Sequence, residues 1–69
     1  MVNTALLQEK IKMSGIKKNF IANRLGISAQ GYQKKERGLI EFKASEIGII
    51  KDILNLSPKE TSDIFLLNK

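Results

Sequence analysis

Short polar and cationic side chains follow one another between Ser28 and Arg37 of this 69-residue chain. Gln30 and Gln33 carry amides that donate and accept hydrogen bonds, and Lys34 and Arg37 carry cations that attract oxyanions. The chemistry that these groups offer is binding to a polar, negatively charged partner. It is not the making or breaking of bonds.

The rest of the chain adds little that could support catalysis. It contains no histidine and no cysteine, no glycine-rich phosphate loop and no pair of carboxylates placed to share a pocket. A catalytic metal would have to rely on scattered Asp and Glu ligands. We therefore expect no enzyme activity, no cofactor and no metal, and no pattern indicates a small-molecule ligand. The lack of cysteine excludes disulfides and fits an intracellular compartment.

The cationic residues gather in the first part of the chain. Residues 1–39 contain eight basic and two acidic side chains, whereas residues 40–69 contain four basic and five acidic ones. One end of the molecule should therefore present a positive field, which is typical of proteins with a polyanionic partner. A merely solubilising surface is the alternative that charge alone leaves open.

Length and composition predict one small globular domain over residues 1–69. Hydrophobic residues make up 42% of the chain and charged residues 28%, which is ordinary for a folded protein and argues against disorder. No apolar run approaches the roughly 18 residues that a membrane span needs, and the N-terminus lacks a signal-peptide pattern. We expect a cytoplasmic protein without membrane association.

The spacing of apolar residues predicts an all-α fold of five short helices. Apolar positions recur every three or four residues, and no alternation persists for a strand's length. Start signals are Asn3 or Thr4 for the first helix, Ser28 for the third and Ser57-Pro58-Lys59-Glu60 for the fifth. The expected ranges are Asn3 or Thr4 to Ser14, about Lys17 to Leu25, Ser28 to about Arg37, about Lys43 to Leu54, and Ser57 onward through Ile64 to Leu67. The expected core comprises Leu7, Ile11, Ile21, Ala22, Leu25, Ile27, Tyr32, Ile47, Ile50, Leu54, Ile64 and Phe65.

The junction between the second and third helices has specific residue types. Ala22 is small, as it must be where one helix crosses another closely. Gly26 permits the backbone conformation that reverses the chain within three or four residues. Ile27 then fills the angle between the helices and Tyr32 packs the third helix down. The third helix is thereby expected to direct its first turn outward.

These residues carry a family resemblance. The pattern is Ile21-Ala22-x-x-Leu25-Gly26-Ile27-Ser28-x-x-x-Tyr32-x-x-x-Glu36-x-Gly38. It resembles the phage-repressor/Cro type of helix-turn-helix domain, also called the XRE-like family, and the likeness extends from about Leu6 to Phe65. The resemblance implies a compact five-helix bundle of the lambda-repressor-like type. It also implies a transcriptional regulator, in particular a phage or prophage repressor, that binds an operator in double-stranded DNA.

The chain departs from the family pattern at several positions. Lys18 stands where many members have a glutamine, and Ala29 stands where a longer polar side chain is common. Gly31 lowers the helix propensity of the third helix by about 0.5–1 kcal/mol relative to alanine. Many members pair the glutamate that corresponds to Glu36 with an arginine of the first helix, but this chain has Ile11 there. We therefore expect Glu36 to pair with a nearby lysine or to face solvent.

The resemblance and the chemistry of each side chain together assign candidate DNA contacts. Glutamine can bind adenine through two hydrogen bonds, and a methyl group can meet a thymine methyl. Ser28 serves as a helix cap whether or not it also contacts DNA, and the Tyr32 hydroxyl is expected to reach solvent or a phosphate. The candidates for base edges are Ser28, Ala29, Gln30 and Gln33. The candidates for phosphates are Lys17, Lys18, Lys34, Arg37 and Lys43.

A single module of this size covers too little DNA for tight binding, so a homodimer is expected, at least on DNA. Four consecutive apolar residues from Ile64 to Leu67 cannot all face a core, which makes Leu66 and Leu67 dimerisation candidates. The alternative function is a protein-interaction module on the same scaffold, as in an antitoxin or antirepressor partner. RNA binding is a third possibility, but stacking platforms are absent.

Overall fold

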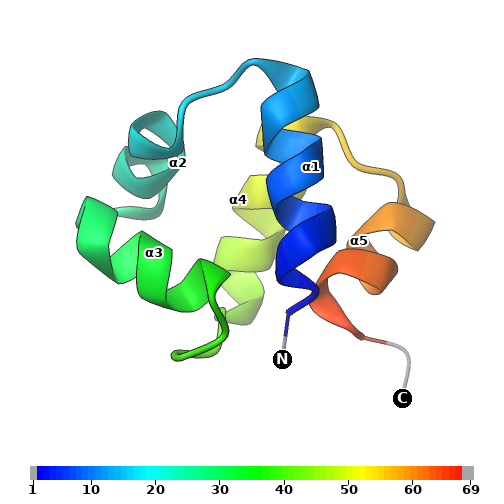
Figure 1. The fold of residues 1–69 in the computed structure, drawn as a ribbon. Helices are drawn as coiled ribbons and strands as arrows, with labels where there is room; N and C mark the ends of the chain where they lie inside the picture. The colour runs from blue at the N-terminus through cyan, green and yellow to red at the C-terminus, as the bar shows by residue number, and fades with distance from the viewer. Residues whose placement is uncertain (1, 68–69) are drawn as a thin grey trace.

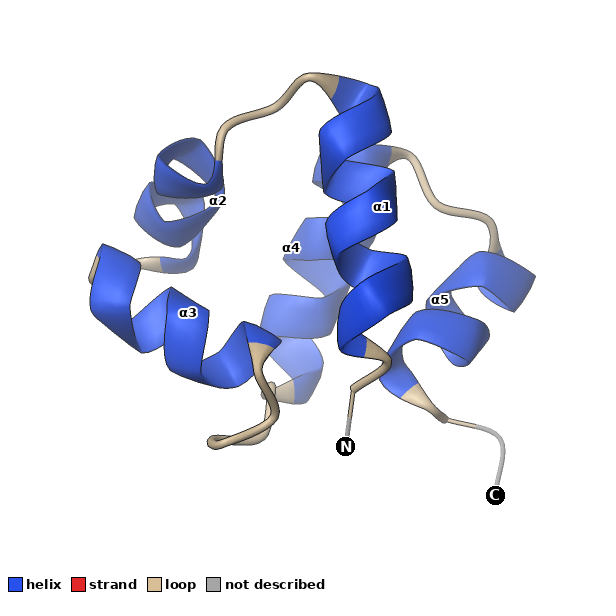
Figure 2. Cartoon of the chain, in the orientation of Figure 1, coloured by secondary structure: helices blue, strands red, loops and turns tan. Residues whose placement is uncertain are grey.

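Capping residues mark where several of the helices begin and end. The computed structural model describes residues 2–67, and these form five α-helices and no strand (Figures 1 and 2). The all-α prediction is thereby confirmed. The helices are α1 Thr4–Ser14, α2 Lys18–Leu25, α3 Ala29–Glu36, α4 Ala44–Leu54 and α5 Pro58–Phe65.

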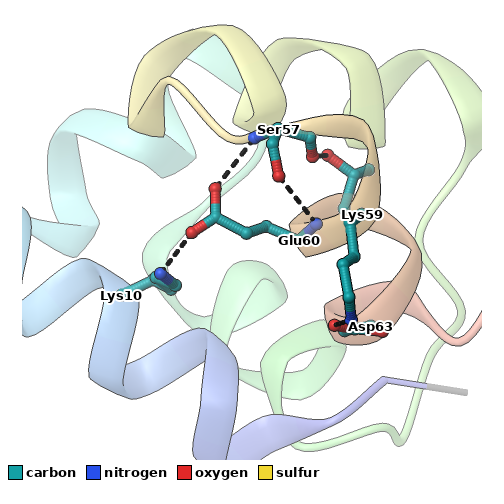
Figure 3. A network of polar contacts seen from close by, with 6 residues as sticks. Lys10, Ser57, Lys59, Glu60 and Asp63 are labelled. Atoms are coloured by element: carbon teal, nitrogen blue, oxygen red, sulfur yellow. Dashed lines mark hydrogen bonds and ion pairs between the residues drawn. The ribbon is translucent and has the colours of Figure 1, made fainter.

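Side-chain oxygens cap α1, α3 and α5, with Ser28 as the cap of α3. Asn3, rather than Thr4, caps α1 by accepting a hydrogen bond from the Leu6 amide at 3.2 Å. Ser57 caps α5 by accepting from the Glu60 amide, and the Glu60 carboxylate accepts from the Ser57 amide at 2.9 Å. Glu60 also binds the Lys10 ammonium, so this capping box joins α5 to α1 (Figure 3).

The core lies where α1, α4 and α5 meet and where α2 packs against α4. Figure 1 shows α1 in front of α4, with α2 and α3 on one side and α5 on the other. Partly buried residues surround this core, among them Leu25, Ile27, Ile47 and Leu54. The buried hydrophobic residues are Leu7, Ile11, Ile21, Ala22, Tyr32, Ile50, Leu56, Ile64 and Phe65.

The end of α5 differs from the sequence prediction. The helix ends at Phe65, so Leu66 and Leu67 do not continue it. Leu66 adopts a left-handed conformation with φ 55°, and the Leu67 amide donates to the Ser62 carbonyl at 3.1 Å. This bond closes the last turn in the way that helix-terminating motifs do. Both leucines therefore lie beyond the helix, 38% and 52% exposed.

None of the helices described for residues 2–67 is long and apolar enough to cross a membrane.

Candidate functional site

Helices α2 and α3 are joined by a tight turn. Gly26 ends α2 with φ 72°, a left-handed conformation that glycine adopts without strain. The Ile27 amide donates to the Ala22 carbonyl at 3.0 Å, which closes the turn. Ala22 is buried and Ile27 packs against the core, so both have the positions that the sequence predicted for them.

The exposed side of α3 carries the residues predicted to contact base edges. Ala29, Gln30 and Gln33 are all exposed. Ser28 is exposed too, and its hydroxyl accepts a hydrogen bond from the Gly31 amide at 3.0 Å. Its role as a helix cap is therefore confirmed, whereas its contact with DNA stays a prediction.

Gly31 is the residue of α3 whose amide binds the Ser28 cap. A Cβ atom at Gly31 would lie 3.2 Å from the Ser28 hydroxyl oxygen, so the hydroxyl would have to shift by a few tenths of an ångström for a larger residue. Glu60 holds the equivalent position after Ser57, and its amide binds that hydroxyl at the same 3.0 Å. The cap therefore does not by itself require glycine at Gly31.

The predicted phosphate contacts differ in how free their charges are. Lys17, Lys34, Arg37 and Lys43 are exposed, with Lys17 and Lys43 directly preceding α2 and α4. Lys18 differs, because its ammonium lies 2.9 Å from the Glu36 carboxylate and its side chain is only 44% exposed. Part of its charge is therefore used within the protein.

Glu36 is the centre of a buried polar network that joins three helices. Its side chain is 3% exposed. Besides Lys18 from α2, it accepts hydrogen bonds from the Tyr32 hydroxyl at 3.0 Å and from the Gln8 amide of α1 at 3.2 Å. The Thr4 hydroxyl donates to the backbone carbonyl of Glu36 at 2.6 Å. Of the two expectations for Glu36, pairing with a lysine is correct and exposure to solvent is wrong.

Tyr32 corrects a second expectation. Its side chain belongs to the core, as predicted, but its hydroxyl reaches neither solvent nor a position open to a phosphate, because the residue is fully buried. The hydroxyl instead donates to Glu36. Burial, together with the nearby Glu36 charge and this hydrogen bond, raises the pKa of Tyr32 far above its ordinary value.

A second buried ion pair, which the sequence analysis missed, joins α3 to α4. The Lys35 ammonium lies 2.6 Å from the Glu46 carboxylate, and the two side chains are 9% and 8% exposed. Burial opposes the charge on Glu46, but hydrogen bonds from the Lys35 ammonium and the Lys43 amide outweigh it, so the pKa of Glu46 is lowered. The signals were present, because Lys35 lies three residues after the core residue Tyr32 and Glu46 lies in the first turn of α4.

A hollow of about 250 Å³ separates the loop after α3 from the end of α5. Leu66 and Leu67 line it together with Ile40, which is 46% exposed. The lining is mostly apolar and includes Glu41. The hollow is lined by Val2, Gly38, Ile40, Glu41, Phe42, Ile47, Phe65, Leu66 and Leu67.

Within residues 2–67, no three His, Cys, Asp or Glu side chains gather where they could hold a metal ion. No family model, curated protein or solved structure matched the chain in comparisons.

Proposed function

We propose that this protein is a sequence-specific DNA-binding regulator of transcription, a repressor of the lambda-repressor-like helix-turn-helix type. On this proposal α2 and α3 form the motif and α3 enters the major groove of an operator. The observation that carries the proposal is the division of α3 into two faces. One face buries Tyr32 and Glu36, and the other presents Gln30 and Gln33 to solvent, while Ala29 is exposed at the start of the helix.

The cations around α3 support the same proposal. Lys34 and Arg37 flank its exposed side, and Lys17 and Lys43 lie where α2 and α4 begin. Free amides at a helix start already favour a phosphate oxygen, although cations there oppose the helix dipole. Lysines in this unfavourable place are consistent with a phosphate partner. Lys18 contributes less than a free cation, because Glu36 holds its ammonium.

The salt dependence of DNA binding tests the proposal. If three to five phosphates are engaged by each protomer of a dimer, log K should fall with log salt with a slope of roughly −5 to −9. Fluorescence anisotropy of a labelled random-sequence duplex, titrated between about 50 and 300 mM salt, measures this slope. A flat response, or no binding at low salt, would contradict the proposal. The alternative would then be a protein-interaction module using the apolar hollow.

We further propose that two copies pair through the apolar surface at the end of α5. Leu67→Asp places a charge on this surface and should shift the protein to monomers in sedimentation experiments at high micromolar concentration, with weakened binding to the preferred DNA sequence. Leu39→Asp is the matched control, because Leu39 is 70% exposed and lies outside the hollow. A wild-type protein that sediments as a monomer under these conditions and loses no affinity through Leu67→Asp would contradict the dimer.

A further inference from the structure

We infer that the buried Lys35–Glu46 ion pair fixes the angle at which α3 is presented, so that both residues position the base-contacting side chains without touching DNA. The inference rests on the proposed function. It also assigns different roles to two consecutive lysines. Lys34 is exposed and can bind a phosphate, whereas Lys35 points into the protein and positions the helix.

The pair is built as a rigid connection. The Glu46 carboxylate oxygen that accepts from the Lys35 ammonium also accepts from the Lys43 amide at 2.8 Å, so it is tied to the backbone where α4 begins. Besides this pair, α3 approaches the start of α4 through the edge contact of Tyr32 with Phe42, whose ring centroids are 6.2 Å apart. The ion pair and this ring contact therefore both connect α3 to the start of α4.

The chemistry of the pair suits positioning better than stabilisation. Removing two charges from water costs free energy that their attraction offsets only in part, so a buried ion pair adds little to stability compared with apolar residues of the same volume. Its hydrogen bonds depend steeply on distance and direction, whereas apolar contacts tolerate sliding. A buried pair at this junction therefore favours one angle between α3 and α4.

The geometry of α3 amplifies small errors of angle. Lys35 lies near the end of the helix and Ala29 at its start, six residues and about 9 Å away along the axis. A swing of about 10° around the ion pair would move the start of α3 by roughly 1.5 Å. Hydrogen bonds to base edges do not survive such a displacement, whereas contacts of flexible lysines with phosphates do.

The test is the double variant Lys35→Met/Glu46→Gln. Methionine approximates the volume of the lysine, and the glutamine oxygen can still accept from the Lys43 amide. A duplex that the wild-type protein selects from a random-sequence pool supplies the preferred DNA. We expect thermal unfolding near that of the wild type, unchanged affinity for random duplex and about tenfold weaker binding to the preferred duplex. An unchanged ratio of the two affinities would overturn the inference.

Two further measurements complete the experiment. Lys34→Met should weaken binding to both duplexes equally, which separates a lost phosphate contact from lost positioning. Residual dipolar couplings should show α3 rotated by about 10° against α4 in the double variant, and an unchanged angle would overturn the inference. If the double variant does not fold, Lys35→Arg replaces it in both measurements, because the wider guanidinium cannot fit the same geometry.

The couplings also separate the two proposals from each other. If the wild-type protein binds no duplex, the proposed function fails, and the angle between α3 and α4 still decides whether the ion pair positions the helix. If the wild type selects a sequence but the double variant discriminates equally well, the proposed function stands and the inference fails.

Discussion

Helices α3 and α5 begin alike and are held differently. Each is eight residues long and follows a serine whose hydroxyl accepts an amide hydrogen bond at 3.0 Å. The buried residues of α5 are Thr61, Ile64 and Phe65, whereas those of α3 are Tyr32, Lys35 and Glu36. Apolar residues thus make up most of the burial of α5, which also has the Lys10–Glu60 ion pair to α1, whereas two of the three buried residues of α3 are charged.

The type of contact affects how closely the orientation of each helix is fixed. The contacts that bury α5 are mainly apolar and less directional, which suffices for a helix that completes a small core. The polar contacts of α3 are directional, because each donor must point at its acceptor. A helix held in this way presents its exposed side in one orientation, as a helix that contacts base edges must do.

Two carboxylates show the same contrast. Glu36, the last residue of α3, is almost fully buried and depends on Lys18, Tyr32 and Gln8 for its hydrogen bonds. Glu60 at the start of α5 binds Lys10 and the Ser57 amide at the surface, with a side chain that is 37% exposed (Figure 3). Water can replace a lost partner of Glu60 but not one of Glu36. Removing Lys18, the partner of Glu36, should therefore lower the free energy of unfolding more than removing Lys10, the partner of Glu60.

The largest effect is expected from Lys18→Met. The substitution removes the cation next to the Glu36 carboxylate and leaves a buried charge with neutral partners alone. Breaking a buried ion pair costs about 3–5 kcal/mol, and the partial exposure of Lys18 reduces this to roughly 2–3 kcal/mol. Urea denaturation followed by circular dichroism measures the change in the free energy of unfolding. A loss below about 0.5 kcal/mol would show that Glu36 does not need its lysine.

Lys17→Met is the matched control for this comparison. Lys17 is exposed and adjacent to Lys18, so its substitution should change the free energy of unfolding by less than about 0.5 kcal/mol. On the proposed function, it should still weaken binding to random and preferred DNA alike. Equal destabilisation by both variants would remove the distinction between the two lysines.

A smaller effect is expected on acidification. Hydrogen bonds from Lys10 and the Ser57 amide lower the pKa of Glu60 from its ordinary 4.5 to about 2. Because the pKa is lower in the folded state, the stabilisation is complete above pH 4.5 and is lost as the pH falls toward 2. Thermal unfolding between pH 5 and pH 2 should therefore shift less for Glu60→Gln than for the wild type. Equal shifts of the unfolding temperature in the two proteins would show that the Lys10–Glu60 contact does not contribute to stability.

The sequence predicted α5 and the apolar core well but the anchoring of α3 poorly. Apolar periodicity and the Ser57–Glu60 capping pattern are local signals, and the structure confirms both. The Lys18 and Gln8 partners of Glu36 and the Glu46 partner of Lys35 lie on other helices. Spacing along α3 therefore indicates that Lys35 and Glu36 face the core, but it does not identify these partners. The predicted end of α5 was wrong because the helix is closed by a hydrogen bond from the Leu67 amide to the Ser62 carbonyl. This bond depends on a left-handed backbone conformation at Leu66, which leucine rarely adopts.

The assignment of DNA contacts stays a prediction. The structure places Gln30 and Gln33 on the exposed side of α3, which is necessary for base contacts and does not establish them. Among the predicted phosphate contacts, Lys18 has its ammonium bound by the Glu36 carboxylate. The sequence had left open whether Glu36 pairs with a lysine or faces solvent.

The central claim is that the exposed side of α3 contacts bases, and the most direct measurement compares Gln30→Ala with Lys34→Ala. Affinity is measured for the duplex that the wild-type protein selects and for a random duplex. Gln30→Ala should weaken binding to the selected duplex by about 1–3 kcal/mol more than to the random one, because a base contact is lost. Lys34→Ala should weaken both equally. Equal losses on the two duplexes for Gln30→Ala would contradict the account.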